Sequence, residues 1–190
     1  MFDLYDEPFD EDGKWDSEGG VVEYCSGLMQ AFAESPEGEA YCNHNGHIGW
    51  THSFLYYSLA YLGTLPQEMS QRDINEVLFD LIPRKVSTDS DSATEIISEL
   101  RAFWEFLERE YQLDNAPSIV AFLDASAEKR LEQELDDPAN YVRHGKVDGH
   151  AGASGWFRHD DAGGNERVRD GVQRVAARQT PVSCRRPNSR

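Results

Sequence analysis

The feature of this sequence that most constrains its fold is the loss of large aliphatic side chains near residue 142. Residues 1–141 contain 14 Leu and 6 Ile, whereas the last 49 residues contain no Leu, Ile, Met or Tyr. Those 49 residues instead hold 9 Arg, 7 Gly, 6 Val and 5 Ala. A segment this poor in large apolar side chains cannot bury enough surface to offset its chain entropy. We therefore expect a folded domain over residues 21–141 and a disordered basic tail over residues 142–190.

The tail has three interpretations: a basic arm that binds nucleic acid or a membrane, a plain disordered terminus, or a segment translated out of frame. The third arises because Arg, Gly, Ala and Val are typical products of GC-rich DNA read in the wrong register. The codons of residues 143–150, read from their second base, can encode Gly-Met-Ala-Lys-Ser-Met-Val-Met, an apolar and helix-favouring run. One inserted base near Val142 explains the whole break, and the bundle would then lack one or two C-terminal helices. Resequencing the coding DNA across this codon separates the three interpretations.

Charge changes at the same point in the chain. Residues 1–141 carry a net charge of −22 and the remainder carries +5, which gives −17 in total. This balance argues against a nucleic-acid clamp, which needs a clustered basic surface. No window approaches the roughly 20 apolar residues of a membrane-spanning helix. The chain opens with acidic residues where a signal peptide would be basic, and three cysteines are too few for a disulfide framework, so we expect a cytoplasmic protein.

Residues 1–20 form an acidic segment in which apolar side chains follow no regular period. These side chains are Phe2, Leu4, Tyr5, Phe9 and Trp15. Such an arm can dock into a basic, apolar groove of a partner. The alternative is an arm that frays or packs loosely on its own domain.

Apolar periodicity predicts an all-α bundle of about six helices. The expected helices cover residues 21–33, 48–62, 70–83, 92–111, a segment that begins at Asn115, and 126–135. A near capping box of Ser70 and Asp73 begins the third helix and Pro83 ends it. Ser90 or Asp91 is expected to cap the fourth helix, and Asn115 the fifth. The polar stretch 39–46 is expected to be a loop.

One constellation has the chemistry of a metal site. Cys42, His44, His47 and His52 lie close in sequence, and sulfur and imidazole ligands suit zinc. Their spacing matches no standard zinc finger. The alternative is a polar loop followed by the start of a helix, with His52 in its first turn.

The step Arg84-Lys85 is a dibasic pair in the acidic domain. It could bind a phosphate or an acidic partner, because Arg donates hydrogen bonds in a fixed fork. The alternative is that both side chains pair with the acidic helix faces around them. No phosphate-binding glycine loop, nucleophile elbow or Cys–His pair with an orienting carboxylate is recognisable, so no catalytic signature is present and enzymatic activity stays open.

Several short runs stand out in residues 50–141. They are Phe54-Leu55-x-Tyr57, Tyr61-Leu62-Gly63, Met69-Ser70, Pro83-Arg84-Lys85-Val86-Ser87, Phe103-Trp104-x-Phe106-Leu107 and Asp137-Pro138-x-Asn140-Tyr141. Together these runs resemble an uncharacterised family of bacterial helical domains. Members of that family continue with a Gly-Met-Ala-Lys-Ser-like segment and then Ala-Gly-Phe-Asp-Met. The resemblance therefore implies a helical fold and a frame change after Tyr141, and it implies no activity.

The function we expect is a protein-interaction or regulatory module whose acidic surface meets a basic protein partner. The alternative is a metal-binding domain or metal-dependent enzyme that uses the cysteine and histidines named above. A third hypothesis is nucleic-acid binding through the Arg-rich tail, which would depend steeply on salt.

Overall fold

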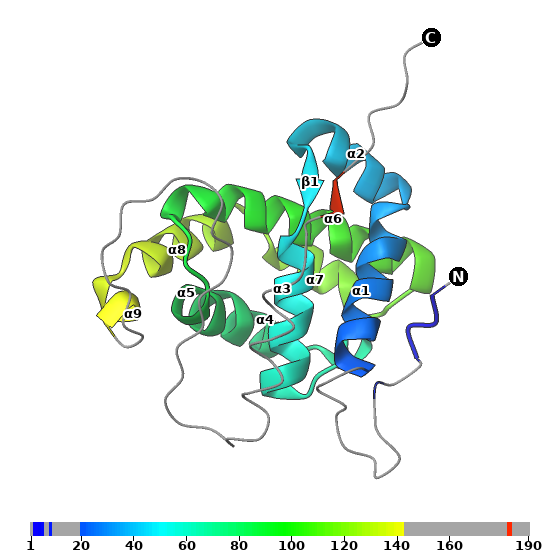
Figure 1. Ribbon diagram of the computed structural model, residues 1–190, viewed down its shortest axis with the longest axis horizontal. Helices are drawn as coiled ribbons and strands as arrows, with labels where there is room; N and C mark the ends of the chain where they lie inside the picture. Colours follow the sequence, from blue (N-terminus) through cyan, green and yellow to red (C-terminus); the bar gives the residue numbers. More distant parts are fainter. Residues whose placement is uncertain (1, 6–7, 9–19, 143–181, 184–190) are drawn as a thin grey trace.

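The structure, a computed structural model, describes residues 2–5, 8, 20–142 and 182–183, and in these residues the chain is a bundle of helices (Figure 1). The predicted all-α class is confirmed. The α-helices are α1 (Gly20–Ala33), α2 (Pro36–Asn45), α3 (Trp50–Tyr57), α4 (Gln71–Glu76), α5 (Ile82–Lys85), α6 (Ala93–Tyr111), α7 (Ala116–Phe122), α8 (Ala125–Asp136) and α9 (Pro138–Val142). Two π-helical segments, η1 (Ser58–Leu62) and η3 (Val77–Leu81), and two 3-10 turns, η2 (Pro66–Glu68) and η4 (Ser90–Ser92), complete the helical elements.

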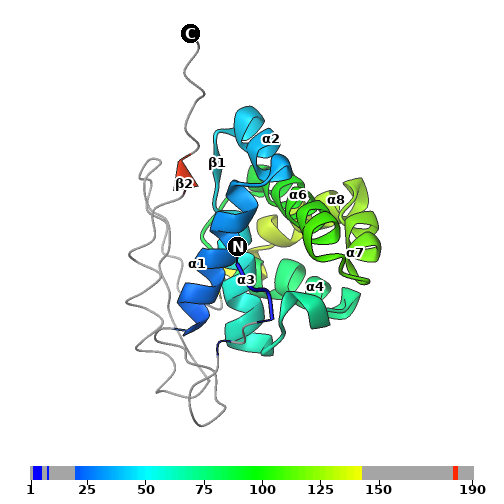
Figure 2. The same ribbon diagram turned by 90° about the vertical axis from the view of Figure 1, so that its right-hand side faces the viewer.

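Helix α6 is the central element of the bundle. It contacts α2, α3, α7 and α8, while α1 packs against α3. Figure 2 shows α1 on one side of the molecule and the pair α7 and α8 on the other. The aromatic side chains expected in the core are all at most 2% exposed: Trp50, Phe54, Tyr57, Phe103 and Trp104. The aromatic stripes predicted from the sequence therefore form the core.

The predicted loop over residues 39–46 is wrong, because most of it belongs to α2. The Ser35 side chain accepts a hydrogen bond from the Gly38 amide at 3.1 Å, and Pro36 occupies the first turn. Both are helix-start signals. A Cβ atom on Gly38 would lie 1.9 Å from the Phe32 carbonyl oxygen, so only glycine allows α1 and α2 to meet this closely.

The predicted capping box at the start of the third helix is confirmed. The Ser70 amide donates to Asp73 Oδ2 at 2.8 Å, and the Asp73 amide donates to Ser70 Oγ at 3.4 Å. The predicted end at Pro83 is wrong. The chain passes from α4 through the π turn η3 into α5, and the Ile82 amide donates to the Val77 carbonyl five residues earlier. This wider turn accommodates a proline that would otherwise clash with the preceding helical turn.

Two predicted caps are replaced by other contacts. Helix α6 is preceded by the 3-10 turn η4 and has no side-chain cap. Asn115 occupies the N-cap position of α7 as predicted, but its side chain makes no capping hydrogen bond; its Nδ2 atom instead donates to the carbonyls of Pro66, at 2.9 Å, and Met69, at 2.8 Å. The amide therefore ties α7 to the loop before α4, which is a long-range contact that sequence spacing does not reveal.

The first residues of the chain pack on the domain. Leu4 is fully buried, and the Tyr24 hydroxyl donates to its carbonyl at 3.0 Å. The Phe2 ring meets the Tyr24 ring edge to face at 5.2 Å, and the Tyr111 hydroxyl donates to the Phe2 carbonyl at 3.1 Å. The contacts of Phe2 and Leu4 support the second alternative for the acidic arm, which is that it packs on the chain's own domain.

A two-residue antiparallel ladder joins β1 (His47–Ile48) to β2 (Val182–Ser183). These two residues of the predicted tail are therefore ordered by pairing. The remaining tail predictions, including disorder and the altered reading frame, fall on residues 143–181 and 184–190, which lie outside the described residues. No helix in the described part is long and apolar enough to cross a membrane.

Candidate functional site

The residues of the predicted zinc site lie on three elements and have separate environments. Cys42 on α2 is disulfide-bonded, so its sulfur is not a free thiolate ligand. His44 is exposed on the same helix, and His47 on β1 lies 3.2 Å from Glu95 through its Nε2 atom. His52 lies in the first turn of α3, as expected. Within the described ranges, no three His, Cys, Asp or Glu side chains come together in a way that could hold a metal ion.

Among the three histidines of the described residues, His52 is the most shielded from water. Its Nε2 atom is buried and has no hydrogen-bond partner in the described part of the chain. Burial disfavours the imidazolium form and lowers the pKa of His52 to about 4. The ring is therefore neutral at physiological pH and acts as a packed side chain of α3.

The dibasic pair also contacts neighbours within the fold. Arg84 Nη2 lies 2.6 Å from Asp80 Oδ1, four residues earlier on the same helical segment. The Lys85 ammonium lies 5.2 Å from the centre of the Tyr61 ring, in cation–π contact. The Arg84–Asp80 contact is of the kind given as the structural alternative, pairing with an acidic helix face, whereas Lys85 meets an aromatic ring.

A buried carboxylate holds the start of α3 against α6. Glu99 on α6 has no exposed surface, and its Oε1 atom accepts hydrogen bonds from the amides of Thr51, at 2.6 Å, and Gly49, at 3.1 Å. Burial raises the pKa of Glu99, and the hydrogen bonds from the backbone amides oppose that rise. We call this contact the Glu99 brace. It satisfies free amide donors at the first turn of α3, as a capping side chain would.

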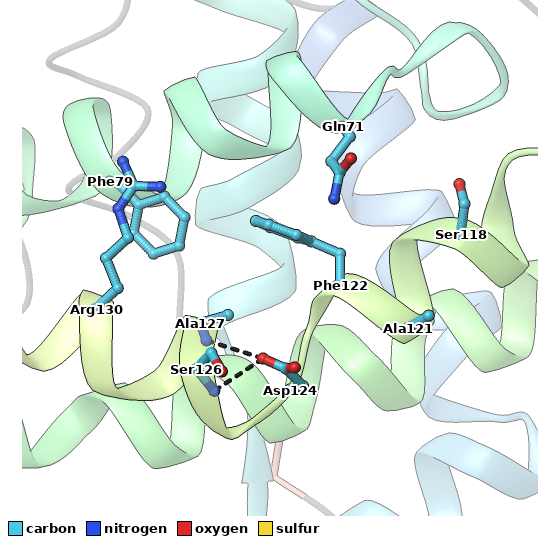
Figure 3. Close-up of a pocket in the computed structure, with 9 residues that line it drawn as sticks. All are labelled: Gln71, Phe79, Ser118, Ala121, Phe122, Asp124, Ser126, Ala127 and Arg130. Atoms are coloured by element: carbon cyan, nitrogen blue, oxygen red, sulfur yellow. Dashed lines mark hydrogen bonds between the residues drawn. The ribbon is translucent and has the colours of Figure 1, made fainter.

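A surface groove lies between the helical segment 71–85 and the pair α7 and α8. Its first part has a volume of about 480 Å³ (Figure 3). The lining residues of this part are Gln71, Phe79, Ser118, Ala121, Phe122, Asp124, Ser126, Ala127 and Arg130. A second part, of about 380 Å³, shares Phe79 and Arg130 with the first. Its lining residues are Arg72, Asn75, Glu76, Phe79, Asp80, Arg84, Arg130, Glu134 and Asn140. We call the two parts together the arginine groove.

Aromatic side chains form the apolar part of the arginine groove. The Phe79 and Phe122 rings meet edge to face with centroids 6.2 Å apart. In Figure 3 the Phe122 ring lies between Gln71 and Arg130, and the guanidinium of Arg130 lies over the Phe79 ring. At the base of the groove, Asp124 Oδ1 accepts hydrogen bonds from the amides of Ser126, at 2.8 Å, and Ala127, at 3.1 Å, and so caps α8. The helix cap and the aromatic pair hold the groove walls in place.

Arg130 is held by neutral groups. Its guanidinium carbon lies 4.0 Å from the centre of the Phe79 ring, and its Nη1 atom donates to Asn75 Oδ1 at 2.8 Å. No carboxylate of the described chain lies within ion-pair distance of it. Stacking on an aromatic ring fixes the plane of the guanidinium and leaves its other N–H groups able to donate.

The groove was not predicted from the sequence. Its walls come from the segment 71–85, from α7 and α8, and from Asn140 on α9, which the packing of the bundle brings together. One sequence signal is Arg84, which belongs to the dibasic step for which partner binding was one of the two alternatives. A second signal is the rarity of basic residues before residue 142, since three of the five arginines in that part line this groove. Within the lining, no nucleophile is paired with a base at hydrogen-bond distance, and the groove presents aromatic surface and guanidinium groups.

Comparisons of this chain with models of protein families, with curated proteins and with solved structures give no match.

Proposed function

We propose that this domain is a protein-interaction or regulatory module that binds a segment of a partner protein in the arginine groove. The observation that supports the proposal is the groove itself, which is open to solvent beside the aromatic pair Phe79 and Phe122. Aromatic side chains and arginine are the residue types most enriched where proteins bind one another.

The shape of the groove favours a peptide segment over a flat protein surface. It runs between two helical walls, and its two parts have volumes of about 480 Å³ and 380 Å³. A segment that lies along it can place one apolar side chain beside Phe122 and polar atoms beside the arginines. This is the helix-in-groove or extended-peptide mode of recognition.

The excess of carboxylates has a separate, long-range effect. Acidic residues far outnumber basic ones in this chain, so its field attracts a partner whose overall surface is basic. This effect accelerates association and weakens with salt. The proposed partner therefore has a basic overall surface, which the acidic chain attracts at long range, and the groove supplies the short-range contacts with its bound segment.

The test fills the groove and compares the proteins that bind. Ala121 is an exposed groove residue, and Ala121→Arg places a long side chain across the opening. Ala40→Arg on α2 is the matched control, because Ala40 is also exposed and does not line the groove. We expect quantitative co-purification from the source cells to recover one partner with the wild type and with Ala40→Arg, and to lose at least about nine-tenths of it with Ala121→Arg. Equal recovery with all three chains would refute groove binding.

A further inference from the structure

The five arginines of the described residues fall into two groups. Arg84, Arg101 and Arg109 each contact a carboxylate within 4 Å: Arg84 with Asp80 at 2.6 Å, Arg101 with Glu105 at 3.2 Å, and Arg109 with Glu37 at 2.6 Å. Arg72 and Arg130 have no carboxylate at this distance in the part of the chain that the structure describes. Both of these arginines line the same part of the arginine groove.

The absence of ion pairs at these two positions is unexpected in so acidic a domain. Glu76, Asp80 and Glu134 line the same part of the groove, yet Arg130 contacts Phe79 and Asn75. The cation–π contact and the single amide hydrogen bond orient the guanidinium without neutralising its charge. A positive charge that is oriented and not neutralised is suited to an external anion.

Arg84 lines the same part of the groove, but its charge is paired. Its Nη1 and Nη2 atoms contact Asp80, at 3.0 Å and 2.6 Å, and its Nε atom is buried, without a hydrogen-bond partner in the described part of the chain. The arginines that can contact a ligand in this part of the groove are therefore Arg72 and Arg130.

The neighbouring part of the groove determines what else the ligand carries. Phe122 is half-buried beside Phe79, and Ala121 leaves space along α7. Arg130 lies on the boundary between this apolar part and the part that holds Arg72. A ligand that spans both parts therefore has an apolar or aromatic side chain next to an acidic one.

We propose that the arginine groove binds an acidic protein segment that carries an aromatic side chain, with its carboxylates on Arg72 and Arg130 and its ring beside Phe122. This inference rests on the proposed function, since it names the chemistry of the segment that enters the groove. It also separates two effects of charge: the acidic exterior acts at long range on the whole partner, and the two arginines select carboxylates at contact distance.

The test measures the binding of two labelled peptides to the full chain by fluorescence anisotropy. One peptide has phenylalanines flanked by glutamates, and the other has the same phenylalanines flanked by lysines. The variants are Arg72→Ala with Arg130→Ala, and a control with Arg101→Ala and Arg109→Ala, which has the same net charge and removes no residue that lines the groove. We expect the groove double variant to weaken binding of the glutamate peptide at least about 30-fold, and the control to change it less than about threefold.

Two further variants separate binding from folding. Arg72 is exposed, so Arg72→Ala alone is expected to keep the fold and to weaken binding of the glutamate peptide at least about fivefold. Ala121→Trp fills the apolar part of the groove without adding charge, and it is expected to abolish binding of the same peptide.

The outcomes distinguish this inference from the proposed function. If the lysine peptide binds and Ala121→Trp blocks it, while the glutamate peptide does not bind, the groove still recognises a segment and the inference about its acidity is wrong. If neither peptide binds at millimolar concentration, or if Ala121→Trp changes neither, both the inference and the groove-binding function are refuted. Equal loss of the glutamate peptide in the two double variants would assign the effect to net charge and would overturn the inference.

Discussion

The Glu99 brace and the arginine groove place charged side chains in opposite environments. Glu99 is fully buried, and the backbone amides of Gly49 and Thr51 satisfy its oxygen. Arg130 is exposed, lies on an aromatic ring and has no carboxylate partner within the described chain. Burial with satisfied hydrogen bonds makes a charge part of the fold, because removing it leaves buried donors unpaired. An exposed charge without a counter-ion contributes little to the fold and is free to contact a ligand.

The largest expected effect comes from removing the brace. Glu99→Ala leaves the amides of Gly49 and Thr51 without their acceptor, and each buried donor left unsatisfied costs about 1–3 kcal/mol. We expect the free energy of unfolding to fall by about 4 kcal/mol, measured by urea denaturation followed by circular dichroism. A loss below about 1 kcal/mol would show that the brace does not support the fold.

Glu99→Gln is the matched control for the brace, because it keeps an oxygen acceptor and removes the titration. Since burial raises the pKa of Glu99, the folded state holds the proton more strongly than the unfolded state. The stability of the wild type relative to Glu99→Gln is therefore highest below the unfolded pKa, and it declines as pH rises through the folded pKa. The opposite slope would mean that the amide hydrogen bonds outweigh burial.

The next effect concerns His52, on the same helix as the amide of Thr51. Its pKa falls from 6.5 to about 4 in the folded state, so the neutral ring stabilises the fold above pH 6.5. That contribution is lost as pH falls toward 4. We expect the wild type to lose about 3 kcal/mol more than His52→Leu between these two pH values, measured by urea denaturation across that range. Parallel pH profiles for the two chains would contradict burial of a neutral imidazole.

The smallest expected effect lies in the groove. Arg130→Ala removes one exposed cation–π contact and one side-chain hydrogen bond. We therefore expect the free energy of unfolding to fall by less than about 1 kcal/mol. Thermal denaturation of this variant beside Glu99→Ala gives the comparison directly. If Arg130→Ala destabilises the domain as much as Glu99→Ala, the arginine belongs to the fold, and the contrast between the two regions disappears.

Local signals in the sequence were sufficient for much of the fold. Regular apolar spacing located the core helices, and the Ser70–Asp73 capping box began its helix where expected. Helix α2 escaped prediction because it has no apolar stripe; Ser35 and Pro36 at its start are the local signals that define it. Asn115 stands at the N-cap position of α7, but its side chain makes tertiary contacts, and a 3-10 turn replaces the cap expected before α6.

The candidate site could not be predicted in the same way. The predicted zinc residues are near in sequence, but α2, β1 and α3 separate their side chains. Arg130 and Phe79 are far apart in sequence, and only the packing of α8 against the segment 71–85 brings them together. Contacts between elements depend on which helix faces meet, and periodicity within one helix does not contain that information.

The π turn η3 determines in which direction the side chains of the following helix α5 point. Removing one residue from this turn would restore ordinary α-helical winding and rotate the next residues by about 100°, since each residue advances a helix by that angle. Arg84 would then swing away from the wall that it shares with Arg72, and the Pro83 ring would press against the preceding turn. Deleting a single residue in η3 would therefore move Arg84 away from Arg72 in the groove wall without unfolding either helix.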